Sequence, residues 1–168
     1  MFKKLLVLIL FFILIISITG CGSGGGNNPS DQDLINTLLD NIQTYIKSLD
    51  ADKLVSVCTF PFNDNGTTYN DAATMKSKYE TDFADIASYD AYNLTSRVVT
   101  ISGTSATVSL TMDYKVTLKD SASHEETSPF VFSCKKIDGS WKFSGEVIST
   151  NTTNNISSTV LGIKGAIK

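Results

Sequence analysis

Cysteine and histidine are the side chains that most readily act as nucleophiles, redox groups or metal ligands, and this chain of 168 residues contains few of them. It has three cysteines, Cys21, Cys58 and Cys134, and one histidine, His124. Structural zinc sites use about four cysteine or histidine ligands at short spacings. Because Cys58 and Cys134 stand 76 positions apart, we expect no metal site, and nothing in the sequence suggests another cofactor.

Cys58 and Cys134 allow two interpretations that the sequence leaves open. One is a disulfide bond closing a loop of 76 residues, which loop entropy would make worth on the order of 4 kcal/mol. The other is a pair of buried free thiols, which pack as small apolar side chains. An oxidising compartment permits the bond without requiring it.

The first half of the presumptive domain has the apolar period of α-helices. Ser30 and Asp33 form a capping-box pattern with aspartate in place of glutamate. Apolar residues then recur every three or four positions as far as Leu49, which predicts a helix of about 18 residues. A short second helix is expected at 50–58, and a third stripe of apolar residues predicts a helix at about 71–88.

The second half changes to the period of two that is typical of β-strands. Apolar and polar residues alternate without interruption over 106–118, which predicts one long strand with one buried face. Further strands are expected at 93–101, 129–137 and 141–148. The dipeptide Asp138-Gly139 is a strong hairpin signal between the last two. Helices followed by hairpins predict an α+β domain, with the N-terminal helices packed on a curved antiparallel sheet.

Acid–base catalysis would need an ionisable side chain on the inward face of that sheet, within hydrogen-bond reach of a substrate. The apolar alternation leaves no such group there, and Asp113 and Glu146 are expected on the opposite, solvent-exposed face. His124 is expected in a polar loop between two strands, as a solvated residue and not as a base. The candidates for lining a pocket, against the commoner role of core packing, are Tyr45, Tyr114, Trp141 and Phe143.

Cys21 stands apart from the other cysteines because it directly follows an apolar run. Two lysines precede twelve consecutive apolar residues, 5–16. This is the arrangement of a secretory signal, and it is too short for a membrane span of about 20 residues. The tetrapeptide at 18–21, Ile-Thr-Gly-Cys, resembles the lipobox of bacterial lipoproteins.

The lipobox resemblance implies that residues 1–20 are a signal peptide removed before Cys21. It also implies that lipid is attached to the Cys21 thiol, which would hold the protein to a membrane of the cell envelope. Gly22 stands where inner-membrane lipoproteins of Gram-negative families carry aspartate, which favours the outer membrane in such a cell.

Residues 21–29 are rich in glycine and asparagine, and this composition predicts a flexible tether between the anchor and the domain. Without residues 1–20 the chain keeps 12 basic and 17 acidic residues, a net charge of −5. That balance excludes nucleic acid as an expected partner and makes anionic lipid head groups unfavourable ones. A tail rich in serine, threonine and asparagine follows at 151–168.

The order of elements over 30–150 resembles the cone-shaped NTF2-like fold, also called SnoaL-like or cystatin-like. The segment YIKSLDADKLVSVC, 45–58, is similar to that superfamily's junction, where one helix ends in an aspartate and the next begins at once. The resemblance implies a single domain. It does not choose between activities, because the superfamily contains binding modules as well as enzymes with a carboxylate or histidine base.

These observations together predict a lipid-anchored envelope protein whose domain faces the periplasm or the exterior. We expect the domain to act as a binding or interaction module for another protein or a small hydrophobic ligand. The alternative is a SnoaL-like or isomerase-like enzyme acting on a small hydrophobic carbonyl compound through an inward acid. A homodimer formed across the sheet is a further alternative, although the polar outward residues argue against a large apolar interface.

Overall fold

The computed structural model describes residues 29–64 and 66–146. The expected signal peptide at 1–20, Cys21, the tether up to residue 28 and the tail at 151–168 lie outside the described residues. Within the described part, no helix is both long and apolar enough to span a membrane.

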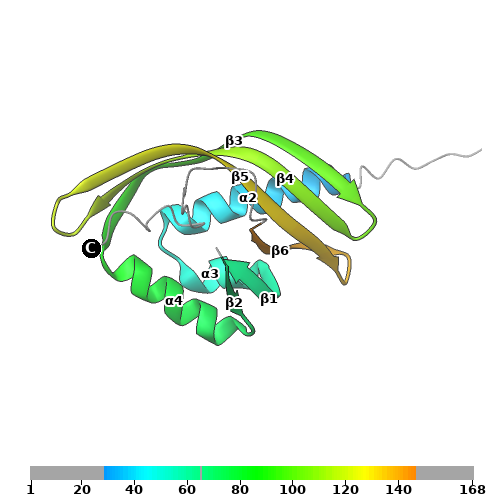
Figure 1. Cartoon of the computed structure of the whole chain (residues 1–168), viewed down its shortest axis with the longest axis horizontal. Coiled ribbons are helices and arrows are strands. Elements are labelled where there is room, and N and C mark those ends of the chain that lie inside the picture. Colours follow the sequence, from blue (N-terminus) through cyan, green and yellow to red (C-terminus); the bar gives the residue numbers. More distant parts are fainter. Residues whose placement is uncertain (1–28, 65, 147–168) are drawn as a thin grey trace, which may run out of the picture.

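In residues 29–64 and 66–146, three helices precede or interrupt a sheet of six strands (Figure 1). The helices are α2 (Asp31–Lys47), α3 (Ala51–Ser56) and α4 (Ala72–Ala84). The strands are β1 (Cys58–Asp64), β2 (Thr67–Tyr69), β3 (Ile86–Ser102), β4 (Ser105–Leu118), β5 (Ser123–Ile137) and β6 (Ser140–Glu146). Their order in the sheet is β2-β1-β6-β5-β4-β3.

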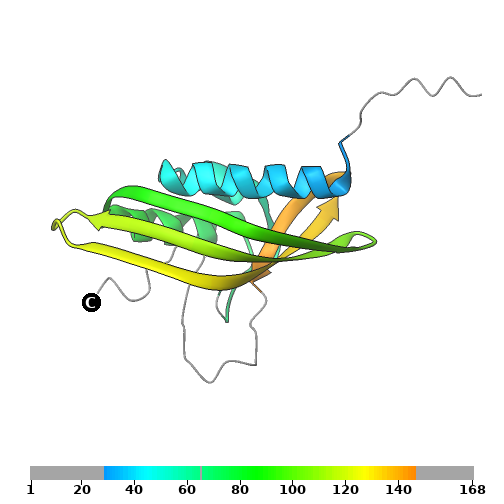
Figure 2. The same cartoon turned by 90° about the horizontal axis from the view of Figure 1, so that it is seen from above.

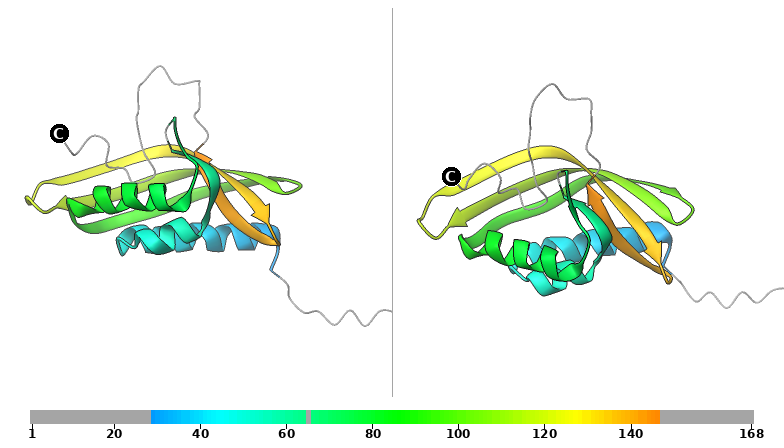
Figure 3. Two further views of the ribbon diagram at one scale, coloured as in Figure 1. Left: turned by 90° about the horizontal axis from the view of Figure 1, so that it is seen from below. Right: turned by 60° about the horizontal axis from the view of Figure 1, so that its bottom comes forward.

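The sheet curves without closing, and the helices lie on its concave side (Figures 1 and 3). Helices packed on a curved sheet are the α+β architecture that the sequence predicts, and this expectation is confirmed. One pair departs from the expected antiparallel arrangement, because β1 runs parallel to β6 while every other pair is antiparallel. The sheet is therefore mixed.

Helix α2 begins with the capping box that its sequence predicts. The Ser30 hydroxyl accepts a hydrogen bond from the Asp33 amide at 3.2 Å, and the Asp33 carboxylate accepts one from the Ser30 amide at 3.1 Å. These bonds satisfy amide groups that have no partner inside the helix. The apolar stripe of α2 is buried and consists of Ile35, Leu38, Leu39, Ile42 and Ile46.

The first residue of α2 is also joined to the hairpin formed by β5 and β6. Asp31 Oδ1 accepts hydrogen bonds from Lys136 Nζ at 2.6 Å and from Trp141 Nε1 at 3.0 Å. The bond from Lys136, followed by that from Trp141, lowers the pKa of Asp31 below its usual value. Trp141 therefore positions the helix against the sheet.

Helix α2 covers part of β3, which is an edge strand of the sheet (Figure 2). The Leu94 amide donates to the Gln43 side chain of α2. Arg97 donates to the Leu94 carbonyl at 2.8 Å and to the Asn36 carbonyl at 3.2 Å, and it pairs with Asp40 at 2.8 Å. These contacts occupy edge groups that would otherwise be open to pairing with another chain.

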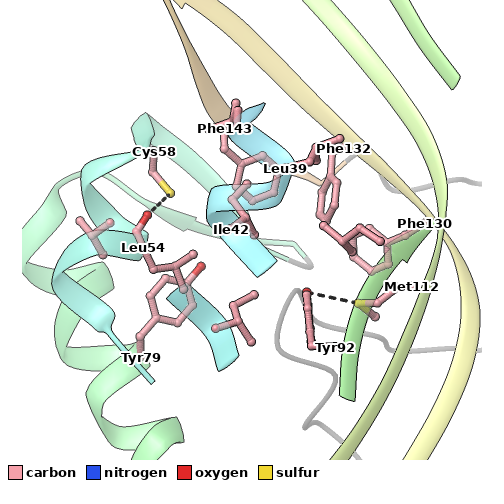
Figure 4. Close-up of a cluster of buried hydrophobic side chains, with 14 of the residues drawn as sticks. Leu39, Ile42, Leu54, Cys58, Tyr79, Tyr92, Met112, Phe130, Phe132 and Phe143 are labelled. Atoms are coloured by element: carbon pink, nitrogen blue, oxygen red, sulfur yellow. Dashed lines mark hydrogen bonds between the residues drawn. The ribbon is translucent and has the colours of Figure 1, made fainter. Parts of the chain in front are cut away.

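The core contains a cluster of aromatic rings where β1, β5 and β6 meet (Figure 4). The Phe143 ring lies 4.8 Å from that of Phe62 and 4.7 Å from that of Phe132, with edge-to-face geometry in both pairs. All three side chains are fully buried. Next to them, Gly145 has a φ of +129°, and a Cβ there would lie 2.5 Å from the Asn63 carbonyl oxygen. Only glycine allows β1 and β6 to approach this closely.

Several element boundaries differ from those predicted. The helix expected at 50–58 ends at Ser56, and Cys58 begins β1. The largest differences are at the starts of β3 and β5. The helix expected at 71–88 ends at Ala84, and Ile86 begins β3. Register shifts in β3 place its buried residues Ile86, Tyr89 and Tyr92 three positions apart. Since bulges add a residue to the strand period of two, this spacing imitates a helix. Strand β5 begins at Ser123, six positions before the expected 129. The inward residues of this early part are polar, and they are described below with the candidate site.

The register of the sheet decides between the two interpretations of Cys58 and Cys134. Both residues pair with Phe143, Cys58 from β1 on one side and Cys134 from β5 on the other. Because neighbouring strands are about 4.8 Å apart, their Cα atoms are separated by about 10 Å, beyond the roughly 7 Å limit for a disulfide. Both are buried free thiols, and Cys58 donates to the Leu54 carbonyl at 3.3 Å.

We therefore expect both cysteines to be reduced and shielded in the native protein. Burial raises the pKa of Cys58 and raises that of Cys134 to about 12, so little reactive thiolate exists at neutral pH. A chain beginning at Gly22 should resist iodoacetamide when folded and take up two alkyl groups in denaturant without reductant. Mass spectrometry would measure this, and a denatured chain that needs prior reduction would instead contain the disulfide.

Candidate functional site

Three polar side chains occupy the inward face of β5 near the β4–β5 hairpin. His124, Glu126 and Ser128 alternate with the exposed Glu125 and Thr127, and apolar residues continue the same face from Phe130 onward. The prediction of an inward face without ionisable groups is therefore wrong, and so is the placement of His124 in a loop. Polar residues at inward positions hide the apolar alternation by which a strand is predicted.

The neighbouring strand β4 supplies the side chains beside this polar row, by which we mean His124, Glu126 and Ser128. Tyr114 pairs with Glu126, and Met112 pairs with Ser128. Both belong to the buried face of β4, whose predicted alternation is confirmed. The polar row is thus set into a face that is otherwise made of aromatic and aliphatic side chains.

Glu126 lies between two groups that can exchange or share protons with it. The Tyr114 hydroxyl donates to Glu126 Oε2 at 3.0 Å, and His124 Nε2 lies 3.8 Å from the same oxygen. The side chains of His124 and Glu126 are 36% and 32% exposed. Solvent or a ligand therefore reaches the carboxylate and the imidazole without any rearrangement of the fold.

Tyr114 is held as a proton donor to this carboxylate. Burial raises the pKa of Tyr114 above its ordinary value, and the negative charge of Glu126 and the hydrogen bond to it raise the pKa further. The phenol therefore stays protonated at neutral pH. Its ring centroid lies 5.7 Å from that of His124, so the two rings flank the carboxylate.

Ser128 is the inner member of the polar row and is only 2% exposed. Within the described structure, its hydroxyl has no hydrogen-bond partner. An unpaired buried hydroxyl costs about 1–3 kcal/mol, and such groups in native proteins call for an explanation. The residue opposite it is Met112, whose unbranched side chain can adapt to a bound molecule. The Tyr92 hydroxyl donates to the Met112 sulfur at 3.5 Å (Figure 4).

The arrangement can bind an apolar molecule that carries one polar group. The hydroxyl of Ser128 and the carboxylate of Glu126 are able to hydrogen-bond that group, while aromatic residues contact the rest. Glu126 and His124 can also take up or release a proton within hydrogen-bond reach of a ligand. Among the described residues, no group of three or more histidine, cysteine and acidic side chains is placed to hold a metal ion.

Sequence patterns do not predict a second buried carboxylate, that of Asp64 at the end of β1. It is buried, and its charge contributes to the raised pKa values of Cys58 and Tyr69, for which burial is the larger cause. Aspartate directly before Asn65-Gly66 is typical of an exposed turn. No pattern in the sequence distinguishes the buried aspartate from a turn residue.

The structure places the other candidates away from the polar row. Phe143 lies in the aromatic cluster and Trp141 contacts Asp31, while Tyr45 packs at the edge of the core on α2. Asp113 lies on the outer face, as expected, and accepts hydrogen bonds there from neighbouring strands. The side chain of Glu146 lies outside the described part.

Comparison with known proteins identifies the fold. No protein-family model matches the sequence, and no curated protein matches it. Solved structures do match, among them an NTF2-like protein from Cytophaga hutchinsonii, with 19% identity over 70% of this chain and 95% of that chain, and a TM-score of 0.56. A candidate dehydratase of the NTF2-like family from Streptomyces avermitilis covers 71% of this chain and 97% of its own, with 12% identity and a TM-score of 0.57.

A third match is a candidate scytalone dehydratase from Novosphingobium aromaticivorans. It is 12% identical over 68% of this chain and 79% of that chain, and its TM-score is 0.57. At these identities the likeness concerns the fold alone. The domain has the NTF2-like cone fold, as the resemblance of the sequence implies, and fold does not determine activity.

The unpaired hydroxyl of Ser128 leads to a stability prediction with a matched control on the same strand. Ser128→Ala should raise the free energy of unfolding by about 1 kcal/mol, because it removes a buried polar group that has no partner. Ser133→Ala should lower it by a similar amount, because the Ser133 hydroxyl donates to the Gly145 carbonyl at 3.0 Å. Urea denaturation measures both, and a destabilised Ser128→Ala variant would mean that the hydroxyl is paired in solution.

Proposed function

We propose that this protein is a lipid-anchored envelope protein whose NTF2-like domain binds a small, largely apolar ligand at the polar row. The ligand carries a hydroxyl group that donates a hydrogen bond to the Glu126 carboxylate, and a carbonyl or hydroxyl oxygen that accepts one from the Ser128 hydroxyl. The observation that carries the binding proposal is the buried, unpaired hydroxyl of Ser128 at the inner end of a half-exposed ionisable row.

The inward face supports this ligand chemistry because of its composition. Aromatic and aliphatic side chains of β3 and β4 surround the polar row, and such a lining with few polar groups is typical of small-molecule sites. Met112 and Tyr114 stand directly opposite Ser128 and Glu126.

The anchoring half of the proposal rests on the sequence at 1–21. A short apolar segment followed by the tetrapeptide that resembles a lipobox places a lipid on Cys21. Two or more acyl chains at one residue hold a protein stably at a bilayer. The domain then follows the short segment rich in glycine, a composition that is typical of linkers.

A second candidate function is proton transfer on a bound carbonyl compound. The contact of Tyr114 with Glu126, with His124 3.8 Å from the same oxygen, favours it. In this function the Glu126 carboxylate removes a proton from the carbon beside the carbonyl, and His124 donates a proton to the substrate at another position. The proton held by Glu126 then passes to His124, which restores both groups. Two titratable groups within reach of one another suit such chemistry.

Anchoring predicts a defined effect of replacing Cys21. Cys21→Ala should leave the chain unprocessed by the lipoprotein pathway and should abolish incorporation of radiolabelled palmitate, because no thiol is left to form the thioether. Membrane fractions of cells expressing either form would be compared after high-salt and carbonate washes. A variant that is still processed and labelled would contradict the anchor.

Ligand binding predicts that two adjacent glutamates behave differently. A panel of aromatic and alicyclic hydroxyketones, whose hydroxyl can donate to the Glu126 carboxylate, should perturb amide NMR signals along the inward face of β4 and β5. Glu126→Gln should weaken the binding of any hit by about tenfold or more, the size expected for one hydrogen bond to a charged group. Glu125→Gln makes the same change on the exposed face and should leave binding unaltered.

The same samples distinguish the two candidate functions. In D₂O, an enzyme would exchange the protons beside the ketone faster than buffer does, and Glu126→Gln but not Glu125→Gln would abolish the exchange. Binding without exchange supports the binding module. If no ketone perturbs the inward face, or if both glutamate variants bind equally, the polar row is not the site.

A further inference from the structure

The large exposed apolar side chains of the described part lie at one end of the molecule. They are Val98, Ile101 and Ile137, which are 63%, 39% and 43% exposed. Val98 and Ile101 belong to the end of β3 that leads into the β3–β4 hairpin, and Ile137 is the last residue of β5 before the β5–β6 turn. Isolated exposed aliphatic residues are ordinary, but their concentration at two neighbouring hairpins is informative.

The two hairpins are held together. Lys136 donates its amide hydrogen to the Thr104 carbonyl at 2.8 Å, and Ser105 pairs with Lys135 across β4 and β5. The two tips therefore form one surface, which we call the hairpin end and define as residues 98–105 and 135–142. Figures 1 and 2 show both tips at the end of the sheet where α2 begins.

The start of the folded chain is fixed to the same end. Asp31, the first residue of α2, accepts hydrogen bonds from Lys136 and Trp141 of the β5–β6 hairpin. Seven residues lie between Cys21 and Pro29, and a fully extended chain over these eight Cα-to-Cα steps spans at most about 30 Å. A lipid on Cys21 therefore keeps the hairpin end within about 30 Å of the bilayer.

The opposite end of the sheet does not fit this constraint. Strand β4 has 14 residues, which correspond to about 45 Å at the rise of an extended strand. If the β4–β5 hairpin stood on the membrane with the strands upright, the start of α2 would lie farther from the surface than the tether reaches. The tether therefore favours the hairpin end as the part that faces the lipid.

The charge of the hairpin end also suits a membrane surface better than the chain as a whole does. Residues 135–142 contain three lysines and one aspartate, and residues 98–105 contain no charged side chain. Because Lys136 pairs with Asp31 of α2, the charges left are those of Lys135, Lys142 and Asp138. The mature chain, by contrast, has a net charge of −5. Exposed aliphatic residues beside lysines are the composition of segments that enter the interface of a bilayer.

We infer that the hairpin end docks on the membrane that holds the lipid of Cys21, with Ile101 and Ile137 entering the interfacial region. This inference rests on the proposed lipid anchor. Docking would fix the orientation of the domain relative to the bilayer. The anchor keeps the domain at a high local concentration near the surface, so even weak interfacial contacts are effective.

The test uses the lipidated full-length protein in vesicles of phosphatidylcholine with phosphatidylglycerol. The variant Ile137→Cys is labelled with an environment-sensitive fluorophore, and Lys119→Cys, an exposed position at the opposite end, is the matched control. The native Cys58 and Cys134 are buried and react slowly. We expect the label at 137 to shift to shorter wavelength in vesicles and to be quenched by spin-labelled lipid, and the label at 119 to do neither.

Flotation of the same samples separates the failure of docking from that of the anchor. Protein that floats with the vesicles while the label at 137 stays water-exposed retains its anchor but overturns docking. Labels that shift at both positions also overturn it, because the domain then lies along the surface. Protein that does not float overturns the anchor and the docking with it.

Discussion

The stability of the domain depends on one contact above all, in which helices cover the apolar concave face of the curved sheet. Strands β3, β4 and β5 turn a row of large apolar side chains toward that face, and the stripe of α2 packs against it. Burial of each such side chain contributes about 1.5–3 kcal/mol, whereas exposed ion pairs contribute at most about 1 kcal/mol. The polar contacts of Asp31, Gln43 and Arg97 therefore set where α2 lies, while apolar burial holds it there.

Because the rest of the concave face is apolar and buried, the polar row on that face points to a functional role. A protein that only had to bury this face would carry apolar residues at 124, 126 and 128, as it does at 130, 132 and 134. The row instead contains a half-exposed imidazole, a half-exposed carboxylate and a buried hydroxyl without a partner in the described structure. Local departures from an otherwise consistent pattern are expected where function, and not stability, has selected the residue.

The predictability of each element from sequence follows from the same physics. Helix α2 and strand β4 were predicted nearly to the residue, because each buries one continuous apolar face with an undisturbed period. The start of β3 was taken for helix, because bulges space its buried residues by three. The start of β5 was missed, because its inward residues are polar. Sequence patterns identify buried apolar surfaces, so the candidate site was the part they could not find.

The proposed ligand site and the proposed membrane-docking surface lie at opposite ends of the sheet. The polar row lies near the β4–β5 hairpin, whereas Asp31 and the hairpin end lie at the other end of β5. Ile137 lies thirteen positions after His124. In an extended strand this separation corresponds to a distance of about 43 Å. A domain held at the hairpin end therefore presents its candidate site away from the bilayer. With the proposed anchor on Cys21, its ligand would then arrive from the aqueous side and not from the bilayer.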